Sequence, residues 1–256
     1  MLHDGRPVVC NITQAKVKRA ATAALLIAHR VPGQSLAFEG DFAGARAHYD
    51  KGIVLYDPAE HRPLATRFGQ DARESILSSR SLALCLLGYP DAAFADADHA
   101  LKDAREIGQA ATLMHALFHG SFTQIYCGNH TAAYALVDEL VALADEKGTL
   151  IWKALGMLAR GWLFALTCKA SDAVELINSG ITKYRSTGAT VFVPLTFAYL
   201  ARAYAELGEF DDAWRCIGEA MTVAETTGER WCEAAARFKS TTRRRFTFET
   251  LFNNLS

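Results

Sequence analysis

The sequence of 256 residues predicts an all-α protein, a right-handed α-solenoid of about five helical hairpins with a period of 40 residues. The first observation is a column of turn residues at this interval, namely Gly88, Gly128, Cys168 and Gly208. The second is an alanine five residues after each of them, at Ala93, Ala133, Ala173 and Ala213. The third is another glycine column with the same spacing, at Gly108, Gly148, Gly188 and Gly228. Self-similarity at one fixed period of this size is typical of solenoids.

Each unit is expected to be an antiparallel pair of helices, as the unit from Gln109 to Gly148 illustrates. Apolar residues recur at helical spacing along residues 110–126 and again after residue 131, which indicates one buried face on each helix. Gly128 separates the two stretches, because glycine tolerates the positive φ that a tight turn needs. A single hairpin cannot bury such faces, so neighbouring units are expected to stack.

An earlier unit carries an insertion. Gly40 and Ala45 repeat the two columns, but the next glycine of the column follows after 48 residues instead of 40, which leaves eight extra residues. These lie within residues 56–71, where Pro58 and Pro63 exclude a regular helix through the start of the stretch. Insertions in solenoids tend to lie on one face, often the binding face.

Two residues modify the later units. Cys168 stands where glycine is expected, which predicts strain or a changed turn at that position. Pro194 falls within the first helix of the last full unit, so this helix is expected to start late, with Pro194 in its first turn, where a missing N–H costs nothing.

The turn and second helix of these units resemble a tetratricopeptide repeat. Glycine, an aromatic residue two positions later and alanine three beyond that form the motif, and residues 208–213 (Gly-Glu-Phe-Asp-Asp-Ala) are its best copy. Residues 40–45 (Gly-Asp-Phe-Ala-Gly-Ala) are nearly as good. The resemblance implies a scaffold that binds protein or peptide partners.

A closer likeness is to the C-terminal repeat region of bacterial adenylate/guanylate cyclase-type signalling proteins that also carry an ATPase domain. Residues 55–71, 201–208 and 210–220 carry it, within a likeness that covers about residues 25–234. In that family the cyclase and ATPase domains lie N-terminal to the repeats, and neither is found in this sequence. The likeness implies a signal-transduction role in a larger parent protein.

Composition narrows the classes of partner and compartment. The net charge of −1 and the pI of about 6.7 argue against a broad nucleic-acid interface, which needs a basic face. No apolar run approaches the length of about 18 residues that a membrane span needs, and the first residues lack the layout of a secretion signal. We therefore expect a cytoplasmic protein without nucleic-acid or membrane partners, in which the six cysteines are unpaired.

The sequence holds no motif for catalysis. Phosphate-binding, dinucleotide-binding and nucleophile-elbow motifs are all absent from it, so no catalytic residue, cofactor or metal is predicted. His115 and His119 would share one helix face and could hold zinc with a third ligand. Without a ligand pair at the spacing of zinc sites nearby, they are interpreted as ordinary helix residues.

The insertion is the best candidate for a binding site. Its polar side chains lie in one irregular stretch, and arginine is suited to carboxylate or phosphate partners. The alternative is that these residues satisfy backbone groups of the loop and cap the next helix. The candidate binding residues are His61, Arg62, Arg67, Gln70, Asp71 and Arg73.

Three regions are expected along the chain. Residues 1–20 fit no repeat column and are expected to be irregular, residues 21–234 form the repeat domain, and residues 235–256 form an atypical basic and aromatic tail around Arg243–Arg245. The tail departs from the repeat pattern at Phe248 and Asn253, which is typical of a truncated array or a changed reading frame.

We interpret the chain as a non-catalytic interaction and regulatory module, and as a fragment of a cyclase-type signalling protein. Its partner would be a protein, a peptide or other domains of the parent, bound on the concave face and the insertion. The alternatives are a cyclase family member whose catalytic domain is absent here, or a solenoid that senses a small molecule or peptide. An uncapped last hairpin also predicts self-association through the C-terminal end.

Overall fold

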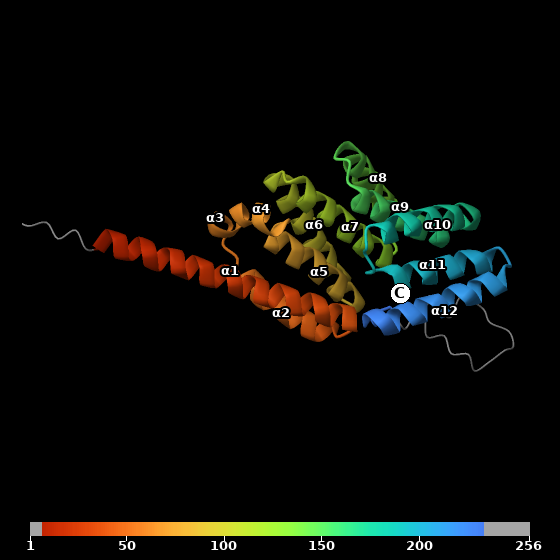
Figure 1. Ribbon diagram of the computed structural model, residues 1–256, viewed down its shortest axis with the longest axis horizontal. Coiled ribbons are helices and arrows are strands. Elements are labelled where there is room, and N and C mark those ends of the chain that lie inside the picture. The colour runs from red at the N-terminus through yellow and green to blue at the C-terminus, as the bar shows by residue number, and fades with distance from the viewer. Residues whose placement is uncertain (1–6, 233–256) are drawn as a thin grey trace, which may run out of the picture.

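The computed structural model describes residues 7–232, with side chains described for residues 21–67 and 69–232. Helices follow one another along the whole of this range (Figure 1). They are α1 (Pro7–Glu39), α2 (Phe42–Leu55), α3 (Pro58–His61), the 3-10 turn η1 (Arg62–Leu64), α4 (Ala65–Phe68), α5 (Ala72–Leu86), α6 (Pro90–Ile107), α7 (Ala110–Tyr126), α8 (His130–Glu146), α9 (Leu150–Leu166), α10 (Ala170–Ser186), α11 (Val193–Glu206) and α12 (Phe210–Thr227).

The long helices pair into five hairpins within the described part of the chain. The pairs are α1 with α2, α5 with α6, α7 with α8, α9 with α10 and α11 with α12. The first helices of successive hairpins, from α5 to α11, pack against one another, and each second helix also packs against the first helix that follows it. This arrangement confirms the predicted all-α solenoid of about five tetratricopeptide-like hairpins.

The turn column shows why the 40-residue period is so regular. Gly88, Gly128 and Gly208 have φ values of +84°, +76° and +81°, and the residue after each donates its N–H to a carbonyl five positions back. That bond satisfies one of the carbonyl groups left unpaired where a helix ends. Cys168 makes the same turn, because Lys169 N donates to the Phe164 carbonyl at 3.0 Å, so Cys168 is held at φ +57°.

The alanine column lies at the start of each second helix. Ala45, Ala93, Ala133, Ala173 and Ala213 are all buried, and the first four expose none of their surface. A small side chain here lets the second helix approach its partner closely. Large side chains fill the space between hairpins, as Trp162 of α9 does against Phe122 of α7, with ring centroids 5.0 Å apart.

The structure tests the expectations for the N-terminal segment and for Pro194. The backbone of residues 7–20 lies in α1, which begins at Pro7, so the expectation of an irregular segment there is wrong from Pro7 onward. The repeat columns gave no signal for this part of α1, because residues 7–20 lie before the first of them. Pro194 lies in the first turn of α11, which confirms the late start of that helix. The predicted tail at 235–256 lies outside the described residues.

The array curves until its two ends meet. The C-terminal end of α12 lies beside the turn between α1 and α2 (Figure 1). Arg230 N and Trp231 N both donate to the Phe38 carbonyl, at 2.8 and 3.0 Å. A Cβ at Gly40 would lie 3.7 Å from the Trp231 Cα, so the two backbones are in close contact. The first hairpin therefore packs against the residues that follow the last one.

Candidate functional site

The insertion between α2 and α5 folds back on the scaffold through its polar residues. Asp71 is the N-cap of α5, where its Oδ1 accepts from Arg73 N and Glu74 N at 3.0 Å each. Its Oδ2 accepts from the Tyr56 hydroxyl at 2.7 Å. Gln70 donates to Ser75 Oγ at 3.1 Å. Two of the six candidate residues, Gln70 and Asp71, thus fix the junction between the insertion and α5.

Arg62 of the insertion and Arg73, which lies in α5, reach towards α6. Arg62 Nη2 lies 3.0 Å from Glu106 Oε2, and Arg73 Nη1 lies 2.9 Å from Asp103 Oδ2. Burial raises the pKa of Asp103, while the two arginines lower it. Arg67 also takes part in interactions within the chain. These contacts agree with the structural alternative for the insertion, and its role in binding stays a prediction.

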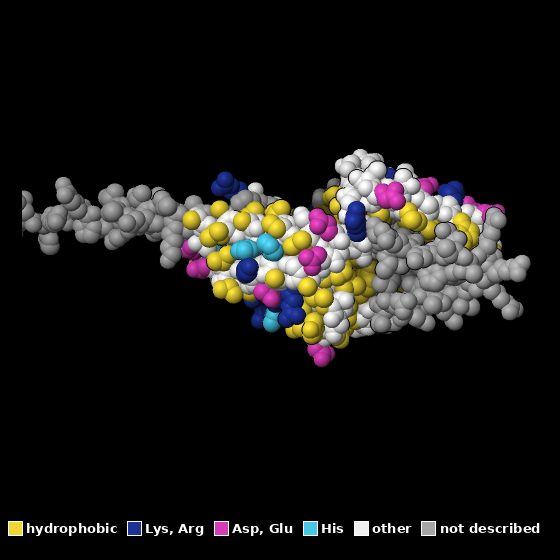
Figure 2. Space-filling model, turned by 90° about the horizontal axis from the view of Figure 1, so that it is seen from below, with side chains coloured by type: hydrophobic (Ala, Val, Ile, Leu, Met, Phe, Trp, Pro, Cys, Tyr) yellow, Lys and Arg dark blue, Asp and Glu magenta, His cyan; other side chains and the backbone are white. Residues whose placement is uncertain are grey.

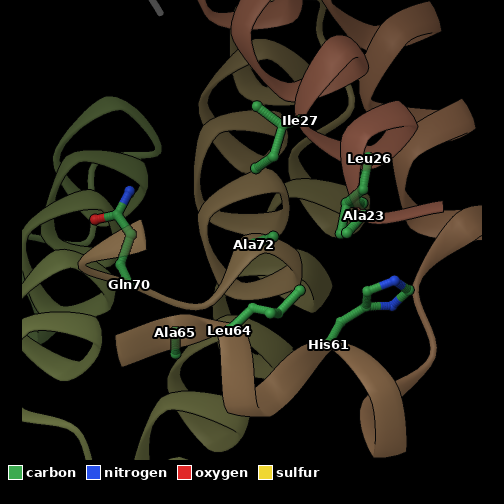
Figure 3. Close-up of a pocket in the computed structure, with 8 residues that line it drawn as sticks. All are labelled: Ala23, Leu26, Ile27, His61, Leu64, Ala65, Gln70 and Ala72. Atoms are coloured by element: carbon green, nitrogen blue, oxygen red, sulfur yellow. The ribbon is translucent and has the colours of Figure 1, made fainter. Parts of the chain in front are cut away.

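His61 lines a crevice between the insertion and α1 (Figure 3). Its Nδ1 accepts from Asp57 N at 2.8 Å, whereas its Nε2 is buried with no hydrogen-bond partner in the described part of the chain. The crevice has a volume of about 10 Å³, close to that of one water molecule. Its lining residues are Ala23, Leu26, Ile27, His61, Leu64, Ala65, Gln70 and Ala72. It suits a water and is too small for a metabolite.

The more unusual site is an aromatic cluster at the place where the array closes. It comprises Phe38, Phe118, Phe122, Tyr126, Phe192 and Trp231. The Phe192 ring lies 5.9 Å from that of Phe38, 5.3 Å from those of Phe118 and Phe122, and 6.3 Å from that of Trp231. Aromatic rings at such distances are attractive beyond the area that they bury.

Glu229 ties the two segments that complete this cluster. Its carboxylate accepts from Phe192 N at 3.0 and 3.1 Å through its two oxygens, and from Trp231 Nε1 at 2.8 Å. Burial raises the pKa of Glu229, and the bonds from Trp231 and Phe192 lower it. Phe192 itself has φ +67°, a left-handed conformation that is rare for a bulky residue. The carboxylate thus holds a strained residue in place.

A polar cluster lies next to the aromatic one, on α1, α5 and α7. Glu74 is fully buried, and its Oε1 contacts Ser78 Oγ at 2.7 Å and His115 Nδ1 at 2.9 Å. Arg30 Nη1 donates to Ser75 Oγ at 3.2 Å, and the ring of His119 lies 4.3 Å from that of His115. Arg30 Nε, Glu74 Oε2 and His119 Nδ1 are buried without a hydrogen-bond partner among the described residues.

Burial determines the protonation of this polar cluster. It raises the pKa of Glu74 well above its usual value and lowers the pKa of His115 to about 3. It also lowers the pKa of His119 far below its usual value, with a further contribution from His115. Burial therefore disfavours the charged forms of both Glu74 and His115, because these forms lose their hydration in the interior.

A second small cavity is bordered by residues of both clusters. It is bordered by Gln34, Ala37, Phe38, Phe42, Ser79, Leu82, Ala83, His119, Phe192 and Trp231. Its volume is about 20 Å³, room for about one water molecule. The segment at Phe192 and the segment at Trp231 therefore fill most of the space that this side of α5 and α7 could offer to a ligand.

In the described part of the chain, no three histidine, cysteine or acidic residues are grouped as metal ligands, and none of its helices is long and apolar enough to cross a membrane. Basic and acidic side chains are interspersed on the face shown in Figure 2. On α12, Phe210, Trp214 and Met221 expose 58%, 50% and 39% of their surface.

No family model matches the chain. Curated proteins of Mycobacterium bovis and Mycobacterium tuberculosis that carry the name HTH-type transcriptional regulator are 29% identical to it over 136 residues. This match takes 53% of the present chain and 15% of theirs. The chain thus spans a small part of the curated relatives that it matches.

Solved structures resemble the chain in fold. BtubC (BKLC) from P. vanneervenii has a TM-score of 0.57 at 16% identity, covering 94% of this chain and 93% of that one. The apo form of RapI has a TM-score of 0.56 at 12% identity, covering 90% and 81%. Kinesin light chain TPR-like repeats of Podosopora anserina have a TM-score of 0.52 at 12% identity, covering 80% and 97%. The chain therefore has the fold of a tetratricopeptide-like repeat protein.

Sequence reasoning missed the aromatic and polar clusters. Phe192 lies in an apolar run, Val191–Val193, that no repeat column explains. This run was the signal in the sequence that could have indicated a buried residue at this position. His115 and His119 were expected to be ordinary helix residues, and they are buried in α7. Only the meeting of the two ends, which has no local signature in the sequence, brings Phe38 and Trp231 to the same place.

Proposed function

We propose that the chain is a non-catalytic interaction and regulatory module, and that its recognition surface is the one now covered by residues 229–231. A single observation carries this proposal. The segment Glu229–Trp231 lies against α1 and α7 as a bound peptide would, with two backbone N–H groups on the Phe38 carbonyl and an aromatic side chain between Tyr126 and Phe192.

The partner is a peptide or an extended protein segment with an aromatic side chain. The rings of Phe122, Tyr126 and Phe192 lie 6.2, 6.4 and 6.3 Å from that of Trp231 and would surround such a side chain. The Phe38 carbonyl accepts backbone hydrogen bonds. Tetratricopeptide-like scaffolds favour this mode of binding because they present a surface along stacked helices. A partner of this kind would displace residues 229–231 and would thereby signal its presence.

The name of the curated relatives supports a regulatory context for the module. Their name describes transcriptional regulators, and the matched stretch is a small part of their length. We infer that the module acts in a regulatory protein of that kind, where it couples partner binding to the other domains. A cyclase-type parent remains an expectation from the sequence resemblance alone.

A peptide from the chain itself tests the recognition surface. The probe is a fluorescein-labelled peptide of residues 226–232 with Cys232 replaced by serine, and fluorescence anisotropy measures its binding. The variant Trp231→Ala vacates the place of the indole between Tyr126 and Phe192, so it should bind the peptide at least tenfold more tightly than the wild type. The matched control is the same peptide with alanine in place of its tryptophan.

Two results would overturn the proposal. One is equal affinity of the variant for the tryptophan and alanine peptides, which would mean that no aromatic pocket is formed. The other is absence of binding to a Trp231→Ala protein whose far-ultraviolet circular dichroism matches that of the wild type. If Trp231→Ala does not fold, Trp231→Leu keeps an apolar side chain and serves the same comparison.

A small-molecule sensor is the second candidate. The unpaired buried groups Arg30 Nε, Glu74 Oε2 and His119 Nδ1 favour it, since buried polar groups are normally satisfied. The cavity of about 20 Å³ beside His119 argues for water in that place. A thermal-shift screen with small polar metabolites separates the two candidates, because a ligand of the native state raises the melting temperature.

Self-association through the last hairpin is a further part of the proposal. The columns of Trp214 and Met221 correspond to Val174 and Ile181 of α10. Ile181 belongs to the hydrophobic core and Val174 packs against it, and α10 packs against the next helix, α11. On α12 the same columns are exposed, and large exposed apolar faces favour association. Sedimentation velocity should show a dimer that Trp214→Glu shifts to monomer. A wild-type monomer at high protein concentration would contradict this part.

A further inference from the structure

Two cysteines from neighbouring hairpins lie in direct contact. Cys85 is near the C-terminal end of α5, and Cys127 is the C-cap of α7. Their sulfur atoms are 3.1 Å apart, and both residues are free thiols that are partly buried. No other pair among the cysteines with described side chains has such a contact. Cys168 is exposed, whereas Cys216 and Cys232 are buried.

A disulfide requires little movement from this arrangement. The sulfur atoms of a disulfide are about 2.05 Å apart, so closure by about 1 Å would bring the two thiols to bonding distance. Both residues lie at helix ends, next to the turns at Gly88 and Gly128, where the backbone can shift more easily than inside a helix. Partial burial still leaves a path for a small reagent to reach them.

We propose that Cys85 and Cys127 are a modification site, a dithiol that forms a reversible disulfide between the second and third hairpins. The oxidant is a small-molecule disulfide. A thiolate of the pair attacks one sulfur of that reagent, which breaks the S–S bond and releases one small thiol. The second cysteine attacks the mixed disulfide and releases the other small thiol. The pair loses two electrons and two protons, and the small disulfide gains them as it is reduced to two thiols.

The rate of this exchange depends on pH. Burial, with a smaller contribution from Cys127, raises the pKa of Cys85 to about 12. Because the thiolate is the reactive form, attack by Cys85 is slow at neutral pH and accelerates by up to about tenfold for each pH unit. The bond would join α5 to α7 and fix the angle between two hairpins of the array, independently of what the recognition surface binds.

Peptide mapping of the full chain tests the proposal. Purified wild-type protein is incubated with glutathione disulfide at pH 8.5, alkylated and digested with trypsin without reduction. Trypsin releases Cys85 within residues 81–102 and Cys127 within residues 106–147. Mass spectrometry should find these two peptides cross-linked, and the cross-link should disappear after reduction. Cys168→Ser is the matched control and should give the same cross-link.

The variants and the stability of the oxidised protein complete the test. Cys85→Ser and Cys127→Ser should give only mixed disulfides with glutathione. The oxidised wild type should melt on the order of 5–10 °C above the reduced protein, because the cross-link closes a long loop. Mixed disulfides alone in the wild type, or cross-links that join two molecules, would overturn the proposal. The wild-type map decides this even if a variant does not fold.

Discussion

Replacing Cys168 by glycine should stabilise the protein, although it removes a side chain. Cys168 is exposed, so its thiol contributes little packing. Its φ of +57° is imposed by the turn, in which Lys169 N donates to the Phe164 carbonyl. A left-handed conformation costs an L-residue roughly 1–2 kcal/mol. Glycine avoids this cost but loses about 0.5–1 kcal/mol in backbone freedom on folding.

The net expectation for Cys168→Gly is a gain of about 0.5–1 kcal/mol in the free energy of unfolding. For a chain of this length this corresponds to a rise of about 1–4 °C in melting temperature. Urea unfolding followed by circular dichroism measures the change. Cys168→Ala is the matched control, because it removes the thiol and keeps the strain, and it should be nearly neutral.

The converse substitution sharpens the test. Gly128→Cys places a side chain in the equivalent turn, where nothing lies within 4 Å of the added Cβ. Only the backbone strain is then introduced, so this variant should lose about as much stability as Cys168→Gly gains. If Cys168→Gly is no more stable than Cys168→Ala, the reasoning from the turn column is refuted.

Three other predictions concern packing, charge and capping. Gly161→Ala should lower the free energy of unfolding by about 1–3 kcal/mol, because the added Cβ would lie 2.5 Å from Ile177 Cγ1. Gly218→Ala, where the added Cβ meets open space, should be neutral or stabilising. A higher urea midpoint for Gly161→Ala than for Gly218→Ala would contradict this. The pKa of His119 is far below its usual 6.5 in the folded protein, so its contribution to stability is present above pH 6.5 and lost as the pH falls. When the pH falls from 7 to 5, the free energy of unfolding of His119→Gln, measured with urea, should therefore decrease by about 2 kcal/mol less than that of the wild type. Equal decreases would exclude a buried neutral imidazole. Asp71→Ala should cost about 2–3 kcal/mol, because it removes the N-cap of α5 and the partner of the Tyr56 hydroxyl, whereas Asp71→Asn should cost less in the same assay.

The solenoid could be predicted from the sequence because the same short motif recurs in each repeat. A left-handed turn residue followed by a small alanine fixes both ends of the connection between helices, and both requirements act over fewer than ten residues. Pro194 was placed correctly for the same reason. These are local constraints of backbone geometry, which composition and spacing reveal.

The aromatic closure could not be predicted in this way. The contact of Phe38 with Trp231 depends on the summed rotation of all intervening hairpins, which small changes in packing determine. The serine and histidine residues of α5 and α7 look like a solvated face in the sequence. They are buried only because α1 and the segments at Phe192 and Trp231 cover that face. The function of the insertion was equally undetermined, since Asp71 is suited both to a binding loop and to an N-cap.

The meeting of the two ends changes how such an array should fold and unfold. In an open solenoid each unit touches only its neighbours, so the terminal units fray independently of the rest. Here the bonds of Arg230 and Trp231 to the Phe38 carbonyl make the first hairpin a neighbour of the last one. Both termini of the array then gain protection together, and disturbing one exposes the other. Contacts so distant along the chain also slow folding, because a large loop must close before they form. Because the two ends of the array are in contact, the protein should unfold cooperatively, whereas an open stack of hairpins would unfold from its ends.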